Sequence, residues 1–452
     1  MQVSNKKEIF TKVIEWFILL QPIIDFLTSL SVRFVEFPLT FGIIVRVLFT
    51  GLICFYMLFL YKGKQKKRMV GYLIGSVAYG ILFIGLNAYF SGVGTVAENG
   101  KMFFKIFYFL FVLFFFYARY LESGHLISDK LLTIVFVEYA VSIFASAVTD
   151  TSFVSYEFAE GYVGWFYAAN EIGAVVAMLA PVALLYIFEI KNLWIKLGVG
   201  FLVCFTAVYI GTKVPFYSIV GAAVMLFVFY GIKTLTARKG WAVLVQGAAT
   251  LLVLMLLYQI NSPMKQNTTV FSGDNFDSHV TDKLESETPD ESLDEIGADG
   301  DVISGKGYLV LNWFLSDRLY YAENAISAYA NADTIHKLFG LGNHFQLKDG
   351  RTLIEMDFLA LLINNGVLGL VLYLIPILYF AALCIFMLFK NIRHILRMQK
   401  ELLYTYVVLI GLGAALVAGH VLVAPAVSVY VAILIVKLYA SLKNEEYKEL
   451  SK

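Results

Sequence analysis

The chain has 452 residues, of which 59% are hydrophobic and 15% are charged, and its formal net charge is +1. Domains that fold in water do not reach this apolar content, which excludes a soluble protein. The near-zero charge, with basic residues dispersed among short loops, gives no support to nucleic-acid binding.

Apolar stretches long enough to cross a bilayer follow one another along almost the whole chain. A membrane-spanning helix needs roughly 20 mostly apolar residues, whereas a membrane β-barrel needs short segments of alternating polarity, and this sequence lacks that alternation. We therefore predict an all-α integral membrane protein with about twelve transmembrane helices. The predicted spans are 10–30, 41–61, 69–90, 102–118, 130–149, 166–189, 194–211, 215–232, 241–260, 366–389, 401–422 and 424–441.

The short loops predict the orientation. Lysines and arginines gather at 62–68, 233–239 and 390–400, and cytoplasmic loops carry such an excess. We therefore expect a multi-pass plasma-membrane protein with both termini in the cytoplasm. The first span lacks a small-residue cleavage site, so it is expected to be a first helix and not a removed signal.

The predicted spans divide the chain into three parts. Residues 1–260 hold helices one to nine, residues 261–352 form one large extracytoplasmic loop, and residues 353–452 hold a surface or re-entrant helix and helices ten to twelve. Within the loop, residues 261–305 are acidic and poor in aromatic residues, which indicates a flexible segment. Residues 306–352 are richer in apolar and aromatic residues and are expected to be helical.

The second half of the loop carries three local signals. An apolar stripe that includes Ala322 and Ala325 predicts a helix near 307–332 with Arg318 in that stripe. Gly340 and Gly342 indicate a turn. The apolar run after the loop is too long for one span, so we expect it to break at 364–366, where two asparagines precede a glycine.

Arg318 is a candidate ligand for a phosphate or diphosphate, because its planar fork matches phosphoryl oxygens. The alternatives are a local pair with Asp317 or Glu323, or a side chain that reaches to water. Lys213, between Gly-Thr and a proline at the outer end of the seventh span, is a second candidate, or else a stray surface lysine.

Arg46 lies several residues inside the second span and therefore needs a carboxylate or an anionic ligand. An ion pair with Asp25 of the first span is at least as consistent with the sequence as ligand binding. His420, at the outer end of the eleventh span, is a candidate acid, base or hydrogen-bond donor, or a packing histidine.

Glu355 and Asp357 follow the loop, on different sides of a predicted short helix. A carboxylate at the membrane rim can act as a general base toward a hydroxyl. The competing interpretation is a helical pair between Arg351 and Glu355 with an acidic helix start. The sequence contains no phosphate-binding P-loop, HExxH, CxxC or GxSxG motif, so neither a metal site nor a cofactor is expected.

The order of these motifs resembles the O-antigen ligase and polymerase superfamily, in its Gram-positive capsule or exopolysaccharide polymerase branch. The resemblance covers nearly the whole chain. It rests on twelve spans with a large loop before the tenth, and on the segments "GTK" (211–213), "KLFGLGNHF" (337–345), "EMDFLALLINNGVLGLVLYL" (355–374) and "AGHVLVAP" (418–425).

The resemblance implies a GT-C-like helical bundle that performs inverting, metal-independent glycosyl transfer at the outer membrane face. The donor would be a glycan on undecaprenyl diphosphate, and the acceptor a sugar hydroxyl of another lipid-linked unit. Arg318 and Lys213, with Arg46 and Arg351 beside them, would contact the diphosphate. A flippase and a chain-length regulator of the same pathway would be further partners.

One departure from the family concerns the base. The ligase branch places a histidine at the start of the helix after the loop, where this chain has Glu355 and Asp357. This favours a polymerase over a ligase, with Glu355 as the preferred base, Asp357 as the second choice and His420 as a supporting donor. A lipid-linked oligosaccharide transporter and a non-enzymatic scaffold are the remaining alternatives.

Overall fold

The computed structural model describes residues 2–35, 39–154, 161–237, 241–260, 262–270, 318–342, 354–391 and 399–450. The helices are, in chain order, α1 (Gln2–Leu19), α2 (Gln21–Phe34), α3 (Phe41–Phe55), α4 (Lys66–Ser91), α5 (Val96–Ser123), α6 (Asp129–Val148), α7 (Ala169–Tyr186), α8 (Leu193–Tyr209), α9 (Lys213–Ala237), α10 (Trp241–Gln259), α11 (Pro263–Val270), α14 (Leu319–Ala330), α15 (Thr334–Phe339), α16 (Asp357–Lys390), α17 (Gln399–Val417) and α18 (Pro425–Leu450). Three short helical turns lie between these helices: η1 (Tyr56–Leu60), η2 (Val93–Thr95) and η3 (Ile187–Glu189). The strands β1 (Phe153–Val154) and β2 (Tyr162–Gly164) form an antiparallel pair.

The prediction of an all-α integral membrane protein is confirmed. Within the described ranges, eight helices are long and apolar enough to cross a membrane, and the bent pair α1–α2 makes a ninth. The predicted spans 194–211, 215–232 and 241–260 correspond to shorter apolar helices. The helices α5, α7 and α18 are the most buried of the candidate spans and form the centre of the bundle.

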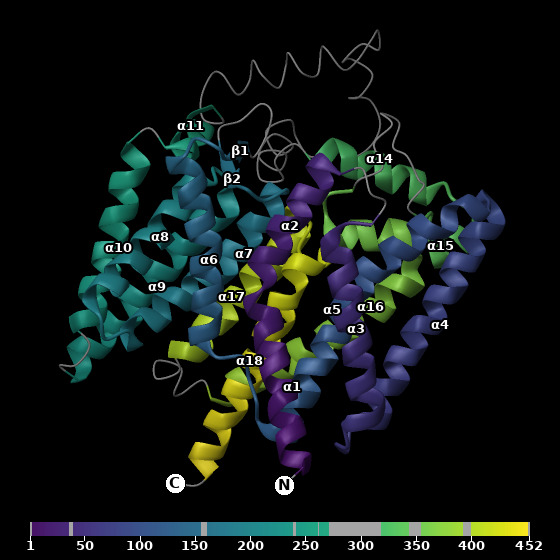
Figure 1. Ribbon diagram of the computed structural model, residues 1–452, viewed down its shortest axis with the longest axis horizontal. Coiled ribbons are helices and arrows are strands. Elements are labelled where there is room, and N and C mark those ends of the chain that lie inside the picture. The colour runs from purple at the N-terminus through teal and green to yellow at the C-terminus, as the bar shows by residue number, and fades with distance from the viewer. Residues whose placement is uncertain are drawn as a thin grey trace.

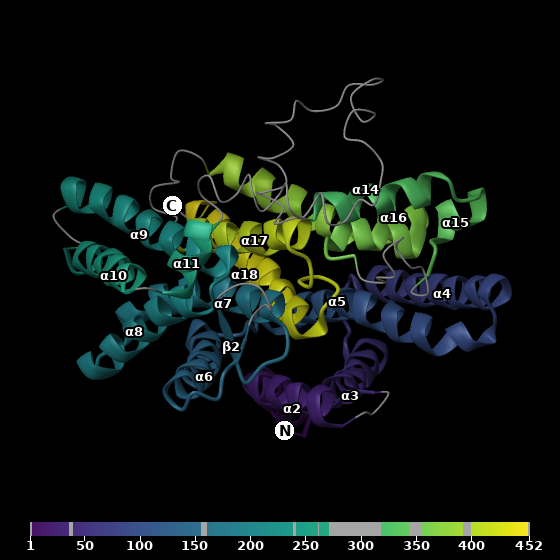
Figure 2. The same ribbon diagram turned by 90° about the horizontal axis from the view of Figure 1, so that it is seen from above.

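The helices form one bundle with two distinct ends (Figure 1). Both chain termini lie at one end, and α11, α14 and the β1–β2 hairpin lie at the other, which we call the upper end. Seen from above, α8 to α10 lie on one side of the centre and α4 with α14 to α16 on the other (Figure 2). The upper end therefore collects the loop elements from both sides of the bundle.

The predicted span 10–30 is not straight, because α1 and α2 meet at Leu20 with a bend of 49°. Pro22 has no backbone N–H to continue the helix, and its ring disfavours the preceding turn. The side chain of Gln21 donates to the Phe17 carbonyl at 3.1 Å and so satisfies a backbone acceptor beside the break.

The predicted break at 364–366 is confirmed: Gly366 has a φ of 67° inside α16. A side chain at Gly366 would place its Cβ 2.3 Å from the Leu338 carbonyl oxygen, so the close approach of α15 requires glycine there. The first part of α16, residues 357–365, is thus a separate short helix at the upper end, and the span proper follows the break. We call residues 357–365 the short helix.

A buried ion pair joins α2 and α3 to α6. Arg46 on α3 lies 2.5 Å from Asp25 on α2 and donates to Gln21 at 2.9 Å, while Tyr139 on α6 donates to the other Asp25 oxygen. Arg46 and Asp25 are only 4% and 8% exposed. The structure thus places Arg46 in the ion pair that was the alternative to ligand binding.

Removal of one partner of this pair leaves an uncompensated buried charge, so Asp25→Asn and Arg46→Gln are each expected to destabilise the fold by about 3–5 kcal/mol. Thermal unfolding of the purified protein in detergent measures this. The control is Lys130→Gln, which removes an exposed cation from α6. Unfolding temperatures equal to that of the control would show that the pair does not hold these helices.

Candidate functional site

Asp357 anchors the upper end of α16. It is fully buried, and its carboxylate accepts three successive backbone N–H groups: His420 at 2.7 Å, Val421 at 2.9 Å and Leu422 at 2.6 Å. Hydrogen bonds to an ionised carboxylate are among the strongest in proteins. Asp357 therefore holds the turn between α17 and α18 against the start of the short helix.

This turn comes unusually close to the chain before α16. Gly419 has a φ of 70°, and a Cβ at this position would lie 1.4 Å from the Glu355 carbonyl oxygen. His420 also has a positive φ, 57°, which is rare for a residue other than glycine. The three backbone hydrogen bonds to Asp357 offset this strain and fix the position of the His420 imidazole.

Glu355 pairs with Arg318, although 37 residues separate them. The Nε and Nη2 atoms of Arg318 lie 2.6 and 2.5 Å from Glu355 Oε2. The glutamate side chain is 40% exposed and that of the arginine 12%. The second carboxylate oxygen, Oε1, forms no hydrogen bond with the described residues, so it remains available to a ligand.

Glu355 precedes α16 and is not itself helical, so the helix start on which the alternative Arg351–Glu355 pair depended comes only after Glu355. Arg351 lies outside the described residues. Arg318 directly precedes α14, and the predicted stripe residues Ala322 and Ala325 of that helix are buried. The rest of the predicted helix 307–332 before Arg318 also lies outside the described residues. Of the acidic segment 261–305, which was predicted to be flexible, the structure describes residues 262–270, and these include the helix α11.

Lys213 is the first residue of α9, directly after a turn at Gly211, whose φ is 75°. The side chain of Asn267 on α11 donates to the Gly211 carbonyl at 2.8 Å and holds the turn. Thr212 packs against Gly173 of α7 so closely that a Cβ on this glycine would lie 3.0 Å from its hydroxyl.

The first turn of α7 connects this region to the His420 turn. Asn170 donates to the Ala418 carbonyl at 3.3 Å, and Gly173, three residues on, contacts Thr212. Lys213, His420, Asp357 and the Arg318–Glu355 pair therefore belong to one connected region of the upper end. Arg46 contributes to the ion pair with Asp25 described above.

The same region contains two ionisable residues that the sequence interpretation missed. Glu171 in the first turn of α7 interacts electrostatically with Lys105 of α5, and Lys105 also interacts with His420. Neither Glu171 nor Lys105 forms a hydrogen bond or a close ion pair with the described residues. Both are ionisable groups within predicted apolar spans, and that signal would have found them.

One electrostatic feature favours a bound anion here. The helices α7, α9, α16 and α18 all begin in this region, and the N-terminus of a helix carries a partial positive charge. Burial lowers the pKa of the His420 imidazole, although the Asp357 and Glu355 carboxylates oppose that shift, so the ring is neutral at physiological pH. No three His, Cys, Asp or Glu side chains gather to hold a metal ion in the part of the chain that the structure describes.

This chain matches a protein-family model. The family described as O-antigen ligase like membrane protein matches residues 7–445. No curated protein matches the chain.

The close approach at Gly419 yields a direct test of the site's geometry. Gly419→Ala places a Cβ against the Glu355 backbone and requires alanine at positive φ, so we expect a loss of at least about 1 kcal/mol of stability. Gly413 of α17 has no atom within 4 Å of its Cβ position, so Gly413→Ala is the matched control and should be neutral or slightly stabilising. Equal unfolding temperatures for the two variants would contradict the described contact.

Proposed function

We propose a specific reaction for this chain, which belongs to the family of O-antigen ligase-like membrane proteins. The family makes it a membrane enzyme of polysaccharide assembly. In our proposal it is a polymerase that transfers a glycan from undecaprenyl diphosphate to a sugar hydroxyl of another lipid-linked repeat unit. The upper end would face the outside of the cell and both termini the cytoplasm, as the basic loops predict.

The observation that carries the proposal is the Arg318–Glu355 pair, set where four helices begin. Transfer breaks the bond from the anomeric carbon to the diphosphate oxygen and forms a new bond from that carbon to the acceptor oxygen. The diphosphate leaves as an anion, so it needs cations and N–H dipoles and not a proton. Arg318, Lys213 and the helix N-termini supply these, with Arg351 as the further cation of the proposal, and inversion follows from a single displacement without a metal.

The acceptor hydroxyl loses its proton to a base, and Glu355 is the preferred residue. Its Oε1 atom is open to a ligand, whereas both oxygens of Asp357 accept backbone N–H groups. Asp357 would therefore act mainly as a positioning residue that fixes the His420 turn. A neutral His420 can donate or accept one hydrogen bond to the substrate.

The first test is elongation by the purified protein in a lipid bilayer, with an undecaprenyl-diphosphate-linked repeat unit as the substrate. Arg318→Ala and Glu355→Gln should each slow elongation by about 10²–10³-fold, as loss of one transition-state contact does. The control is Glu323→Gln, an exposed carboxylate on α14. Undiminished elongation in both variants would refute the site, and movement of lipid-linked glycan between leaflets without a new bond would indicate a transporter.

A second test separates the base from the positioning residue by stability. Asp357→Asn presents an amide to backbone donors and should cost about 1.5–3 kcal/mol for each charged hydrogen bond lost. Glu355→Gln should lower the unfolding temperature less than Asp357→Asn, because the half-exposed side chain keeps an amide oxygen for Arg318. It should lower the elongation rate by about 10²–10³-fold, within the usual contribution of a general base. If Asp357→Asn were fully stable yet inactive, and Glu355→Gln active, the base would be Asp357.

A further inference from the structure

Three polar side chains at the upper end lack a hydrogen-bonding partner, and we call them the polar triad. They are Lys105 of α5, Glu171 in the first turn of α7 and His420 in the turn between α17 and α18. Lys105 interacts electrostatically with both of the others. None of the three side chains forms a hydrogen bond or a close ion pair with the described residues, although a half-buried charge at the membrane rim needs a partner.

The packing of α5 explains why Lys105 comes close to the His420 turn. Phe109 follows Lys105 by one helical turn, so the two side chains lie on the same face of α5. The Phe109 ring centroid lies 5.6 Å from that of Tyr373 on α16, and the Tyr373 hydroxyl donates to the Leu422 carbonyl at 3.3 Å. This face of α5 is therefore held against the turn that carries His420.

The first turn of α7 brings Glu171 to the same turn. The neighbouring Asn170 donates to the Ala418 carbonyl at 3.3 Å, two residues before His420. An acidic residue in the first turn of a helix can serve only to stabilise the helix start. Glu171 is half-buried, however, and neither of its carboxylate oxygens accepts a hydrogen bond from the described residues. A carboxylate removed from water without donors is costly, which points to a donor that comes from a ligand.

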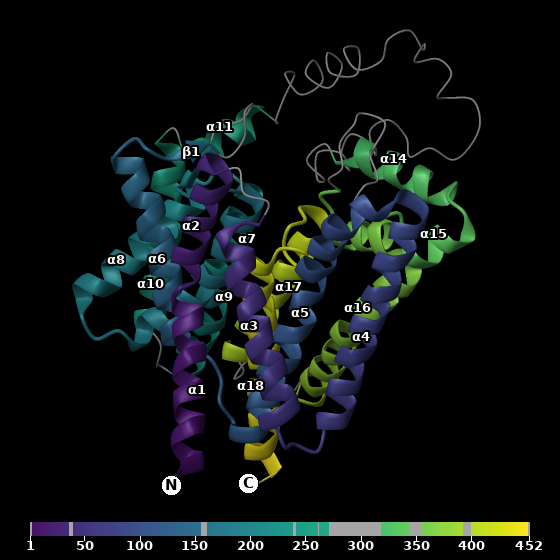
Figure 3. The ribbon, with the colours of Figure 1, turned by 45° about the vertical axis from the view of Figure 1, so that its right-hand side comes forward.

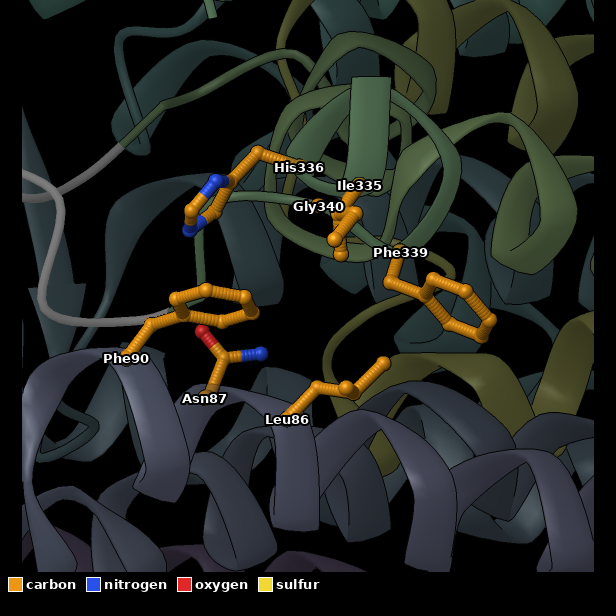
Figure 4. A pocket seen from close by; sticks show the side chains of 7 residues that line it. All are labelled: Leu86, Asn87, Phe90, Ile335, His336, Phe339 and Gly340. Carbon is orange, nitrogen blue, oxygen red and sulfur yellow. The ribbon is translucent and has the colours of Figure 1, made fainter. Parts of the chain in front are cut away.

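The polar atoms of the triad are open to water, in contrast to other unpartnered polar atoms of the bundle. Figure 4 shows a sealed case, where Asn87 of α4 lies against α15 in a hollow without room for a water molecule. The Lys105 ammonium, the Glu171 carboxylate and the His420 imidazole also lack partners, but they are not among the sealed atoms of the described residues. A ligand hydroxyl can therefore reach each of them.

The chemistry of the polar triad favours a sugar ring over a phosphate. An ammonium donates hydrogen bonds, a carboxylate accepts them, and a neutral imidazole can do one of each. A sugar hydroxyl both accepts and donates, so neighbouring hydroxyls of one ring can satisfy all three groups. An ionised diphosphate can only accept hydrogen bonds, and the Glu171 carboxylate would repel it.

His420 connects the polar triad to the Arg318–Glu355 pair. Its imidazole interacts electrostatically with Lys105 and with both members of that pair. The preceding residue, Gly419, lies against the Glu355 backbone. A sugar whose reacting hydroxyl meets the Glu355 carboxylate would therefore present its remaining hydroxyls to the triad.

We propose that the polar triad is the subsite for the acceptor sugar, in which Lys105 and Glu171 bind hydroxyls of the ring that receives the glycan. This inference rests on the proposed function. Lys105 and Glu171 position the acceptor, while Glu355 and Arg318 act on the reacting atoms. Loss of either Lys105 or Glu171 therefore weakens binding of the acceptor and leaves binding of the donor unchanged.

The test uses the full-length protein in nanodiscs and the repeat-unit oligosaccharide released from its lipid. This oligosaccharide lacks the diphosphate, so it can accept a glycan but cannot donate one. Its equilibrium binding is measured without a donor, and its KM is measured with the lipid-linked unit as the donor. Lys105→Gln and Glu171→Gln should each weaken binding and raise this KM about tenfold, the loss expected from one hydrogen bond to a charged group. The KM of the donor should stay the same.

The matched control is Glu98→Gln, which removes an exposed carboxylate of α5 that also interacts electrostatically with Lys105. It should change neither the binding nor the KM of the oligosaccharide. If Glu98→Gln and Glu171→Gln had equal effects, the cause would be a general change of charge near Lys105, and the subsite would be refuted. Lower unfolding temperatures of Lys105→Gln and Glu171→Gln with unchanged binding would also refute it, because they would indicate a structural ion pair between α5 and α7.

The outcomes separate this inference from the function on which it rests. Elongation by the wild type, with oligosaccharide binding and KM unchanged in Lys105→Gln and Glu171→Gln, would refute the subsite alone. A rise confined to the KM of the donor would refute it as well. Wild-type protein that binds the oligosaccharide through Lys105 and Glu171 but forms no glycosidic bond would refute the proposed function and support the triad as a sugar site.

Discussion

The upper end of the bundle depends on one buried carboxylate. Taking Asp357 out of water costs several kcal/mol unless its charge is neutralised or hydrogen-bonded. The three N–H groups of residues 420–422 meet that demand and form an anion-binding nest in the backbone. The nest requires the positive φ values of Gly419 and His420. The turn therefore stabilises the buried carboxylate, and the carboxylate stabilises the strained turn. They join two segments more than 60 residues apart and place the Glu355 backbone against Gly419.

A second set of backbone contacts holds the other end of the short helix. Gly366 breaks α16, and the peptide groups exposed by the break pair with the Gly340–Gly342 turn, while Tyr79 of α4 donates to the Asn365 carbonyl at 2.5 Å. The short helix is therefore fixed at both ends by backbone contacts. Ala325 of α14 packs on it with Ala360 and Ile363, so the position of Arg318 at the start of α14 follows from the same platform.

Sequence periodicity and composition were sufficient to predict the membrane class, the helical stretches and the break at Gly366. These features depend on the length of local apolar segments and on the position of a glycine. They also identified Arg318 and Glu355 as candidates. They could not pair these two residues, since a contact across 37 positions depends on how α14 packs on the short helix. The alternative pair of Arg351 with Glu355 assumed that the helix had begun before Glu355, whereas α16 begins at Asp357. Glu171 and Lys105 each stand as an ionisable group in an apolar run, which the sequence could have revealed, but only the fold brings Lys105 near both Glu171 and His420.

The Arg318–Glu355 pair also suggests an order of events within the proposed reaction. One guanidinium cannot form its strongest hydrogen bonds with the Glu355 carboxylate and with a diphosphate at the same time. The diphosphate would compete well for Arg318, because it carries more negative charge than the carboxylate and nearby helix N-termini would also stabilise it. Donor binding would therefore draw Arg318 away from Glu355. The carboxylate, still 40% exposed and now without its cation, is then free to accept the proton of an acceptor hydroxyl. In this order the carboxylate becomes a stronger base when a leaving group is in place, which couples deprotonation of the acceptor to the presence of a donor.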